Sequence, residues 1–327
     1  MRDKLDKTDR RIIYELDRNC RIPETRLAQL VGKSKEAVRY RIRKLREESI
    51  IKGFTIFVDG TMAGLETYKF YLHTREKPAL IRSFLKHVRT QPNAVWLGTG
   101  DGAWNVGVTF FAKSKAVFFR EKNELFSHFR KLVVGQLVGA VVETHVFGKK
   151  FLAQTDEHVE EIRVLGSREK NKVDAKDVSI LRCLIENGRM PYVEIASRTK
   201  LKPEAVRSRV KAMERSGIIA IYTAMLDYRK LGFEFYKTFL YFEGLVGKEE
   251  RRLFEIARRH PNVVSYLKVL APWDIELEIM AENYHDYNEI INYFREKFSD
   301  TLVKVDTTVL NVDEILPSKD VPEFIEA

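Results

Sequence analysis

The sequence has few of the residues that build disulfide frameworks, zinc sites or membrane spans. Of its 327 residues only two are cysteine, Cys20 and Cys183, and no Cys-x-x-Cys or Cys/His spacing surrounds either. This spacing suggests neither a disulfide framework nor a metal site, so both cysteines are expected to be structural. No apolar run approaches the roughly 20 residues that cross a bilayer, and the N-terminus lacks the apolar core of a secretion signal. We therefore expect a cytoplasmic protein without membrane contact.

Sequence signatures of enzymes are missing as well. The chain contains no nucleophile triad, Walker loop, dinucleotide-binding fingerprint or paired carboxylate site. Its seven histidines are scattered, and no two of them stand at a spacing typical of metal or tetrapyrrole ligands. We therefore expect no enzymatic activity and no cofactor.

Charge is abundant and unevenly distributed. The net charge of +10 and the pI near 9.4 fit a polyanionic partner. Residues 1–60 carry 16 basic and 10 acidic side chains, residues 61–171 carry 17 and 11, residues 172–228 carry 11 and 7, and residues 229–327 carry 13 and 19. In the second half of the chain only residues 172–228 therefore carry a net positive charge.

The chain contains an internal repeat. A shift of 168 residues superimposes two stretches without a gap. The densest match places Glu36-Ala37-Val38-Arg39 on Glu204-Ala205-Val206-Arg207. Other matches are Asp6 on Asp174, Asp9 on Asp177, Arg21-Ile22-Pro23 on Arg189-Met190-Pro191 and Arg41 on Arg209. These matches predict a duplicated unit.

Each copy is predicted to form three short helices. In the first copy Ile12, Ile13 and Leu16 form an apolar stripe, Pro23 opens the second helix and Ser34 caps the third. Apolar residues recur along the third helix at four- and three-residue spacing and should face inward. They are Val38, Ile42 and Leu45 in the first copy and Val206, Val210 and Met213 in the second.

The outer side of each third helix carries cations. A short helix fits the major groove of DNA, where its first turns meet base edges and the surrounding cations meet phosphates. We predict that double-stranded DNA is contacted by Lys33, Ser34, Lys35, Arg39, Tyr40, Arg43 and Lys44 in the first copy and by Lys202, Arg207, Ser208 and Lys211 in the second. Arg39 and Arg43 are the leading base-reading candidates, and the first copy is expected to bind more strongly. The alternative is that these charges are merely solvated.

A family resemblance rests on the same residues. The elements Leu5-Asp6-x-x-Asp9-x-x-Ile12-Ile13, Arg21-Ile22-Pro23, Leu27-Ala28, Ser34-x-x-Ala37-Val38-x-x-Arg41 and Ile50-Ile51-x-Gly53 resemble the Lrp/AsnC family of transcription regulators. The resemblance implies an N-terminal winged helix-turn-helix followed by a small α/β domain for effector binding and oligomerisation. We therefore expect both parts twice in this chain.

The predicted fold class is therefore α+β, with two winged helix-turn-helix domains and two ferredoxin-like βαββαβ domains. The expected segments are residues 1–60 and 61–152 for the first unit, a charged linker at 153–171, residues 172–228 and 229–316 for the second unit, and a tail at 317–327. A sheet with both helices on one face needs a partner for its other face. The resemblance implies pairing of such sheets, so we expect an intramolecular pseudo-dimer, with further homo-oligomers left open.

The resemblance also implies a small-molecule site at a Gly-Asp loop between the second and third strands. The effector candidates, with an amino acid as a possible ligand, are Thr99, Gly100, Asp101 and Trp104 in the first copy and Trp273 and Asp274 in the second, which lacks the glycines. The alternative is that Gly100 and Gly102 only permit a tight strand connection.

The leading functional hypothesis is a sequence-specific transcription regulator. Because Tyr40 corresponds to Ser208 and Lys35 to Pro203, its two unlike heads should read an imperfect palindrome. One alternative is an architectural protein that binds DNA without sequence preference. The other is an enzyme on the same scaffold, since sirohaem decarboxylases resemble this family.

Overall fold

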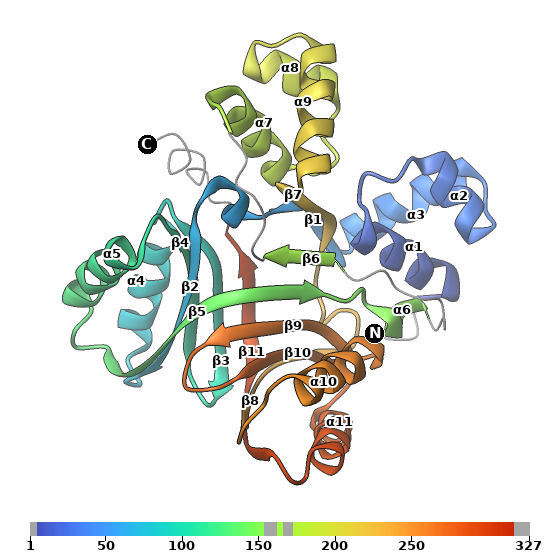
Figure 1. Ribbon diagram of the computed structural model, residues 1–327. Helices are drawn as coiled ribbons and strands as arrows, with labels where there is room; N and C mark the ends of the chain where they lie inside the picture. Colours follow the sequence, from blue (N-terminus) through green and yellow to red (C-terminus); the bar gives the residue numbers. More distant parts are fainter. Residues whose placement is uncertain (1–4, 154–161, 166–172, 317–327) are drawn as a thin grey trace.

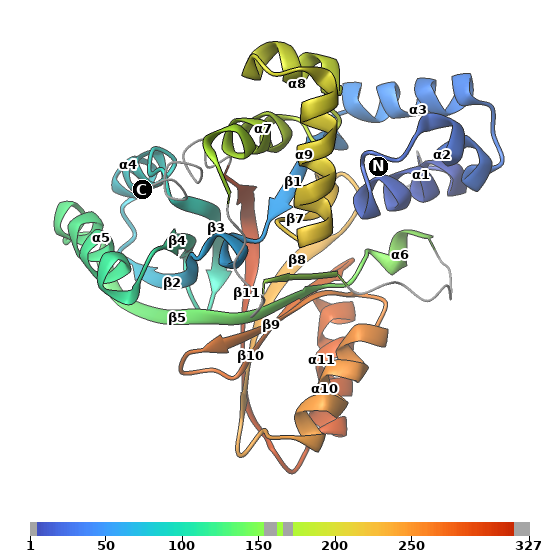
Figure 2. The same cartoon turned by 45° about the horizontal axis from the view of Figure 1, so that its top comes forward.

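Two three-helix heads stand on one side of a large β-structure (Figures 1 and 2). The computed structural model describes residues 5–153, 162–165 and 173–316. The first head consists of α1 (Lys7–Arg18), α2 (Glu24–Val31) and α3 (Lys35–Glu47), and the second of α7 (Ala175–Glu186), α8 (Tyr192–Thr199) and α9 (Pro203–Ser216). The three-helix pattern predicted for each copy is therefore present. In these described parts no helix is long and apolar enough to span a membrane.

Each head is followed by a βαββαβ unit, as predicted. The first unit comprises β2 (Glu66–Thr74), α4 (Pro78–Val88), β3 (Ala94–Gly102), β4 (Val106–Ala112), α5 (Lys115–His128) and β5 (Val133–Val146), after the short helix η2 (Gly60–Ala63). The second comprises β8 (Glu234–Phe242), α10 (Lys248–Arg259), β9 (Val263–Leu270), β10 (Ile275–Ala281), α11 (Tyr284–Lys297) and β11 (Leu302–Ile315). The order of elements is therefore the same in both copies.

The two units share one hydrogen-bonded sheet. Across the described residues its strands follow the order β2-β4-β3-β11-β8-β10-β9-β5-β6, and β2 also pairs with β5. This extra pairing closes the sheet into a barrel, and β6 pairs with the last residues of β5, beyond the part that pairs with β2. The copies meet twice, where β3 pairs with β11 and where β5 pairs with β9, both antiparallel. The barrel is the intramolecular pseudo-dimer that the repeat predicted.

The outer face of each half of the barrel packs on its own pair of helices, which lie on opposite sides of the molecule (Figure 1). In the first half, Phe70 and Val108 pack with Phe84 of α4. In the second half, Leu277 packs with Phe294 of α11. Because side chains alternate along a strand, the other face of every strand points into the barrel.

One end of the barrel interior is filled by aromatic rings from equivalent positions of the two copies. Trp104 lies 4.7 Å from Tyr71, and Trp273 stacks on Phe239 at 4.2 Å, between ring centroids. Tyr71 and Phe239 themselves are 4.9 Å apart. The repeat places Tyr71 on Phe239 and Trp104 on Trp273, so the pseudo-twofold axis passes between these rings.

Beyond the aromatic rings the interior holds buried charges. Glu276 Oε1 accepts from Lys69 Nζ at 2.9 Å, from Lys237 Nζ at 2.7 Å and from the Tyr71 hydroxyl at 2.9 Å. Lys237 Nζ also donates to Glu278 Oε1 at 2.7 Å. Burial alone would raise the pKa of Glu276, but Lys237 and Lys69 more than offset it and lower that pKa to about 2. The cluster is thus a charge-balanced link between the halves.

The strands that follow the heads also join the two copies. β1 (Ile51–Val58) and β7 (Ile219–Leu226) pair antiparallel with each other, so each copy supplies one strand of a shared ribbon. The ends match by symmetry, because Asp59 N donates to Ile218 O and Asp227 N donates to Ile50 O, both at 2.9 Å. Helix α1 packs on β7 and α7 packs on β1. Each head therefore rests on the strand of the other copy.

The structure differs from the sequence-based expectation at the linker. Residues 162–165, expected to be part of a charged linker, form strand β6 (Ile162–Leu165) on the edge of β5, after the short helix α6 (Lys150–Ala153). A short strand gains backbone hydrogen bonds from an available edge, and composition does not reveal that edge. The rest of the predicted linker and the predicted tail at 317–327 lie outside the described residues.

Substitution Glu276→Gln should destabilise the barrel, because Lys69 and Lys237 would then share only Glu278. Removing one partner of a buried ion pair typically costs about 3–5 kcal/mol, so the calorimetric Tm at pH 7 should fall by several degrees. The folded-state pKa of Glu276 is lowered to about 2, below the unfolded value near 4.3. Its contribution is therefore present above pH about 4 and is lost as the pH falls towards 2.

A matched control for this substitution is Glu314→Gln. Glu314 pairs with Arg89 at 2.8 Å, but the two side chains are 35% and 41% exposed. Such a surface pair contributes at most about 1 kcal/mol. Equal Tm shifts in the two variants would show that the buried cluster does not stabilise the barrel.

Candidate nucleic-acid interface

Helices α3 and α9 present the predicted DNA-binding side chains. Ser34 caps α3 by accepting from Ala37 N at 3.2 Å, and Pro203 occupies the first turn of α9 after Lys202. Their inner faces are buried in the heads, as predicted, by Val38, Ile42 and Leu45 in α3 and by Val206, Val210 and Met213 in α9. This packing orients the opposite faces towards solvent.

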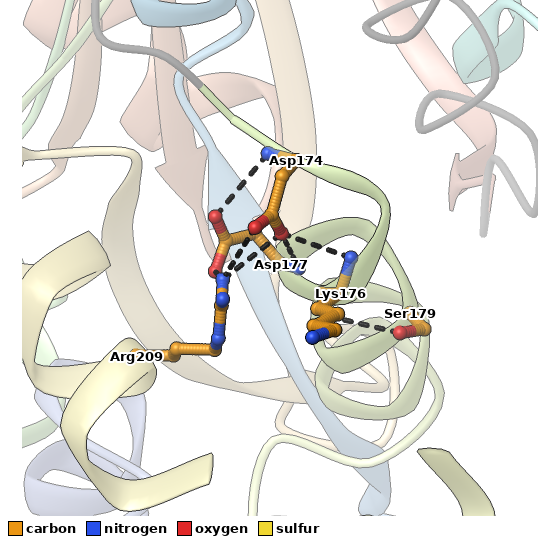
Figure 3. Close-up of polar contacts among 5 residues, drawn as sticks. All are labelled: Asp174, Lys176, Asp177, Ser179 and Arg209. Carbon is orange, nitrogen blue, oxygen red and sulfur yellow. Dashed lines mark hydrogen bonds and ion pairs between the residues drawn. The ribbon is translucent and has the colours of Figure 1, made fainter. Parts of the chain in front are cut away.

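An ion-pair network fixes α9 against α7 (Figure 3). Asp174 and Asp177 form a capping box at the start of α7. Arg209 Nη1, from α9, lies 2.9 Å from Asp174 Oδ1 and 2.8 Å from Asp177 Oδ1. The backbone N–H of Asp177, helped by Arg209, holds the pKa of Asp174 below its usual range. The carboxylates thus cap one helix and anchor another.

The first head contains the same network. Arg41 Nη1 lies 2.8 Å from Asp6 Oδ2 and 2.7 Å from Asp9 Oδ1, and Asp6 and Asp9 form the capping box of α1. All three residues are shared by the two copies of the repeat. Sequence reasoning recorded that match but did not assign it a role. Both copies keep two aspartates and one arginine at the same spacing. That match in the sequence could have predicted the ion-pair network.

The outward side chains of α3 are partly occupied by local contacts. Arg39 binds Glu24 of α2 through Nε at 3.1 Å and Nη2 at 2.7 Å, although its side chain is 58% exposed. The carboxylate of Glu24 raises the pKa of Arg39, and Arg39 lowers the pKa of Glu24. Arg43 makes a long contact with Glu47 at 3.9 Å and lies over the ring of Tyr40. The side chains of Lys33, Ser34, Lys35 and Lys44 are exposed as well.

The outward side chains of α9 are less constrained. Lys202, Arg207, Ser208 and Lys211 are exposed. The repeat places Tyr192 where the first head has Glu24, so α8 offers no carboxylate at that position. Within the described residues no hydrogen bond or ion pair engages Arg207. Within that part of the chain, Arg207 is therefore free to bind another partner, whereas Arg39 is already bound to Glu24.

Arginines that sequence reasoning left without a role connect the heads. Arg21 Nη1 donates to Gly188 O at 3.0 Å and to Met190 O at 3.1 Å, while Arg189 Nη1 donates to Cys20 O at 2.8 Å. Arg21 and Arg189 are equivalent in the repeat. The retained Arg-x-Pro motif was therefore a signal of contact between heads, which fixes one reading helix relative to the other.

The glycine-rich effector candidates lie in a strand at the junction between the copies. Thr99, Gly100 and Asp101 belong to β3, and Gly100 is paired with Leu310 of β11. A Cβ on Gly100 would collide with the carbonyl oxygen of Val309. Gly102 has a φ of 141°, and a side chain there would meet the backbone of β11. In this arrangement the glycines allow the two copies to approach closely.

The remaining effector candidates are the two tryptophans and Asp274. Trp104 and Trp273 are 0% and 1% exposed within the aromatic end of the barrel. Asp274 accepts from the backbone N of Phe242 at 2.7 Å, which ties together two strand ends of the second unit. The structure therefore brings the two tryptophans together and does not gather all six candidates into one open loop.

Substitution Arg209→Met should destabilise the second head, because Asp177, which is 14% exposed, would lose its cationic partner. The expected cost is about 1–2 kcal/mol, measured as a lower calorimetric Tm. The control is Arg215→Met, which removes an exposed cation from the same helix and should change the Tm little. If both variants melt at the wild-type temperature, the network does not stabilise the head.

Comparison with known proteins supports the repeat and the fold. Residues 5–46 and 173–214 each match the AsnC-type helix-turn-helix domain. Over its whole length the chain has the fold of a solved structure, the siroheme decarboxylase NirDL, with a TM-score of 0.63, 12% identity and coverage of 98% of this chain and 97% of that one. At that identity the likeness concerns the fold alone.

Sequence relatives point to one family. The HTH-type transcriptional regulator AldR of Mycolicibacterium smegmatis is 35% identical over 102 residues, which cover 30% of this chain and 60% of AldR. An uncharacterised HTH-type transcriptional regulator of Pyrococcus abyssi is 31% identical over 151 residues, which cover 46% of this chain and 92% of that protein. With two AsnC-type domains and a relative matched over nearly its full length, this chain belongs to the Lrp/AsnC family of helix-turn-helix transcription regulators.

Proposed function

We propose that the protein regulates transcription by binding double-stranded DNA through both heads at once. The observation that carries this proposal is the presentation of α3 and α9 with buried inner faces and exposed basic outer faces. A helix of this kind fits the major groove, and its cations neutralise phosphates. The DNA-contacting residues are those predicted from the sequence, led by Arg39 and Arg43 in the first head and Arg207 in the second.

The connection between the heads sets the geometry of the proposed DNA site. The shared β1–β7 ribbon and the contacts of Arg21 and Arg189 hold the heads to each other. Two reading helices in a fixed arrangement select half-sites at one spacing, about one helical turn apart or a multiple of it. The chain therefore binds as a dimer would, without a second subunit.

The heads are expected to read different sequences. Tyr40 in α3 is replaced by Ser208 in α9, and Lys35 is replaced by Pro203. Glu24 also restrains Arg39 in the first head. In the second head the residue equivalent to Glu24 is Tyr192, which cannot form an ion pair with Arg207. Unlike side chains on a symmetric scaffold favour an imperfect palindrome.

The operator is the first test of this function. Footprinting on promoter fragments should return discrete sites that are imperfect palindromes, with affinity falling steeply as salt rises because phosphate counterions return. Affinity for the promoter should exceed that for random DNA by about a thousandfold or more. A strictly symmetric site would contradict the non-equivalence of the heads, and near salt-independence would contradict DNA binding. Equal affinity for all DNA would favour the architectural alternative.

Substitutions at the Arg39–Glu24 pair test how the first head reads DNA. Arg39→Ala should weaken operator binding by about tenfold or more, and more than Arg207→Ala does. Glu24→Gln should strengthen binding several-fold, because it removes a negative charge and frees Arg39 for DNA. Fluorescence anisotropy should measure Kd at a series of salt concentrations. We expect the plot of log Kd against log salt concentration to be steeper for Glu24→Gln than for the wild type.

The matched control for the glutamate is Glu194→Gln in α8. Its carboxylate binds Arg198 at 2.8 Å and leaves Arg207 unaffected, so the Kd should stay near that of the wild type. Equal effects of Glu24→Gln and Glu194→Gln would mean that only general charge matters. If Arg39→Ala harmed binding no more than Arg207→Ala, the ranking of the heads would be wrong.

A second candidate function is an enzyme on the same scaffold. It is favoured by the fold shared with the siroheme decarboxylase NirDL over nearly the whole chain. An absorption spectrum of the purified protein titrated with sirohaem tests this candidate, since a saturable shift of the tetrapyrrole band would support it.

A further inference from the structure

A cavity of about 910 Å³ lies between the barrel interior and the parts of the chain that support the heads. The barrel lines it with residues of both halves, among them Thr67 and Thr109 from the first and Phe235 from the second. Helix α1 contributes Asp17, and the β1–β7 ribbon, which crosses between the heads and the barrel in Figure 2, contributes Thr223. The volume is at the upper end of the range for small-molecule sites, about 300–1,000 Å³.

Most of the cavity wall is apolar. Trp96, Phe111, Phe147, Phe235 and Met280 line it from different strands and from the end of β5. Such a wall favours a ligand with a large apolar body. A volume of this size exceeds what an amino acid fills, so the cavity differs in kind from the site implied by the family resemblance.

The acidic groups that line the cavity already have hydrogen-bond donors. Glu278 accepts from Lys237 at 2.7 Å, and Asp313 accepts from the indole N–H of Trp96 at 2.7 Å. Asp17 accepts from Lys149 at 2.5 Å and from the Thr223 hydroxyl at 3.2 Å. The wall therefore offers few free carboxylates to a cationic ligand.

Unused donors gather on one part of the wall. Thr67 and Thr109 are only 4% and 6% exposed, and among the described residues their hydroxyls have no hydrogen-bond partner. Lys69 is the register partner of Thr109 and shares a face of β2 with Thr67. Its ammonium has three N–H donors, of which the described residues engage one, through Glu276. Buried polar groups without partners are costly, so this patch is suited to an acceptor on a ligand.

We propose that this cavity is a binding site for a drug-sized small molecule that has a predominantly aromatic or aliphatic body and one anionic acceptor group. The acceptor binds Thr67, Thr109 and Lys69, and the apolar body packs against Trp96, Phe111 and Phe235. Lys52, which is 53% exposed, stands at the rim and marks a route from solvent. The inference is independent of DNA binding, because the residues proposed to hold the ligand all lie in the barrel.

The test uses two probes that share one body. 8-Anilinonaphthalene-1-sulfonate carries an acceptor, and N-phenyl-1-naphthylamine has the same rings without it. With the full chain in its folded state, fluorescence titration and calorimetry should give saturable binding of the sulfonate, one molecule per chain, and weaker binding of the neutral probe. No saturable binding of the sulfonate would overturn the proposal.

The variants Thr67→Val and Thr109→Val locate the bound sulfonate. Each removes one hydroxyl while keeping the shape of the side chain, and should weaken sulfonate binding about tenfold without changing binding of the neutral probe. Because these hydroxyls have no partner in the fold, the variants should melt no lower than the wild type. The matched control is Thr199→Val in α8, whose hydroxyl donates to Ile195 O at 2.8 Å far from the cavity. Unchanged sulfonate affinity in both cavity variants would overturn the proposal.

Discussion

The pairing of β3 with β11 and of β5 with β9 is the constraint on which the rest of the structure depends. These pairings close the barrel, so that the inner faces of both half-sheets are covered at once. Without them, Lys69 would lose Glu276, and Tyr71 would lose the rings of Phe239 and Trp273 of the other copy. Gly100 and Gly102 matter for the same reason, because any side chain at either position would push β11 away from β3.

The buried charges show why the two copies are not interchangeable. Lys69 and Lys237 occupy equivalent positions, but Glu276 and Glu278 correspond, with the one-residue insertion, to Gly107 and Thr109. Two copies of the first unit would therefore place two lysines in the barrel without a carboxylate, which is costly in a buried site. Joining unlike units in one chain secures the charge-balanced combination and allows the heads to diverge.

In the heads, the residues that hold the scaffold together are alike in both copies, whereas residues that face solvent differ. Asp6, Asp9 and Arg41, with their equivalents Asp174, Asp177 and Arg209, hold the helices of each head together. Arg21 and Arg189 join the heads to each other. These positions are alike in both copies because the scaffold requires them. Tyr40 and Lys35, which face solvent, differ from their counterparts because packing does not restrict them.

The sequence by itself determined the repeat, the three helices of each head, the βαββαβ order and the inward faces of α3 and α9, because these depend on local periodicity and capping. Only the tertiary structure decided which residues meet across the repeat. Gly100, an effector candidate by resemblance, lies at the strand pairing, and Trp104 and Trp273 lie in a shared aromatic cluster. Neither the Arg39–Glu24 contact nor the cavity beside Thr67 and Thr109 could be predicted. Such contacts join residues distant in sequence, and no local pattern records a distance in space.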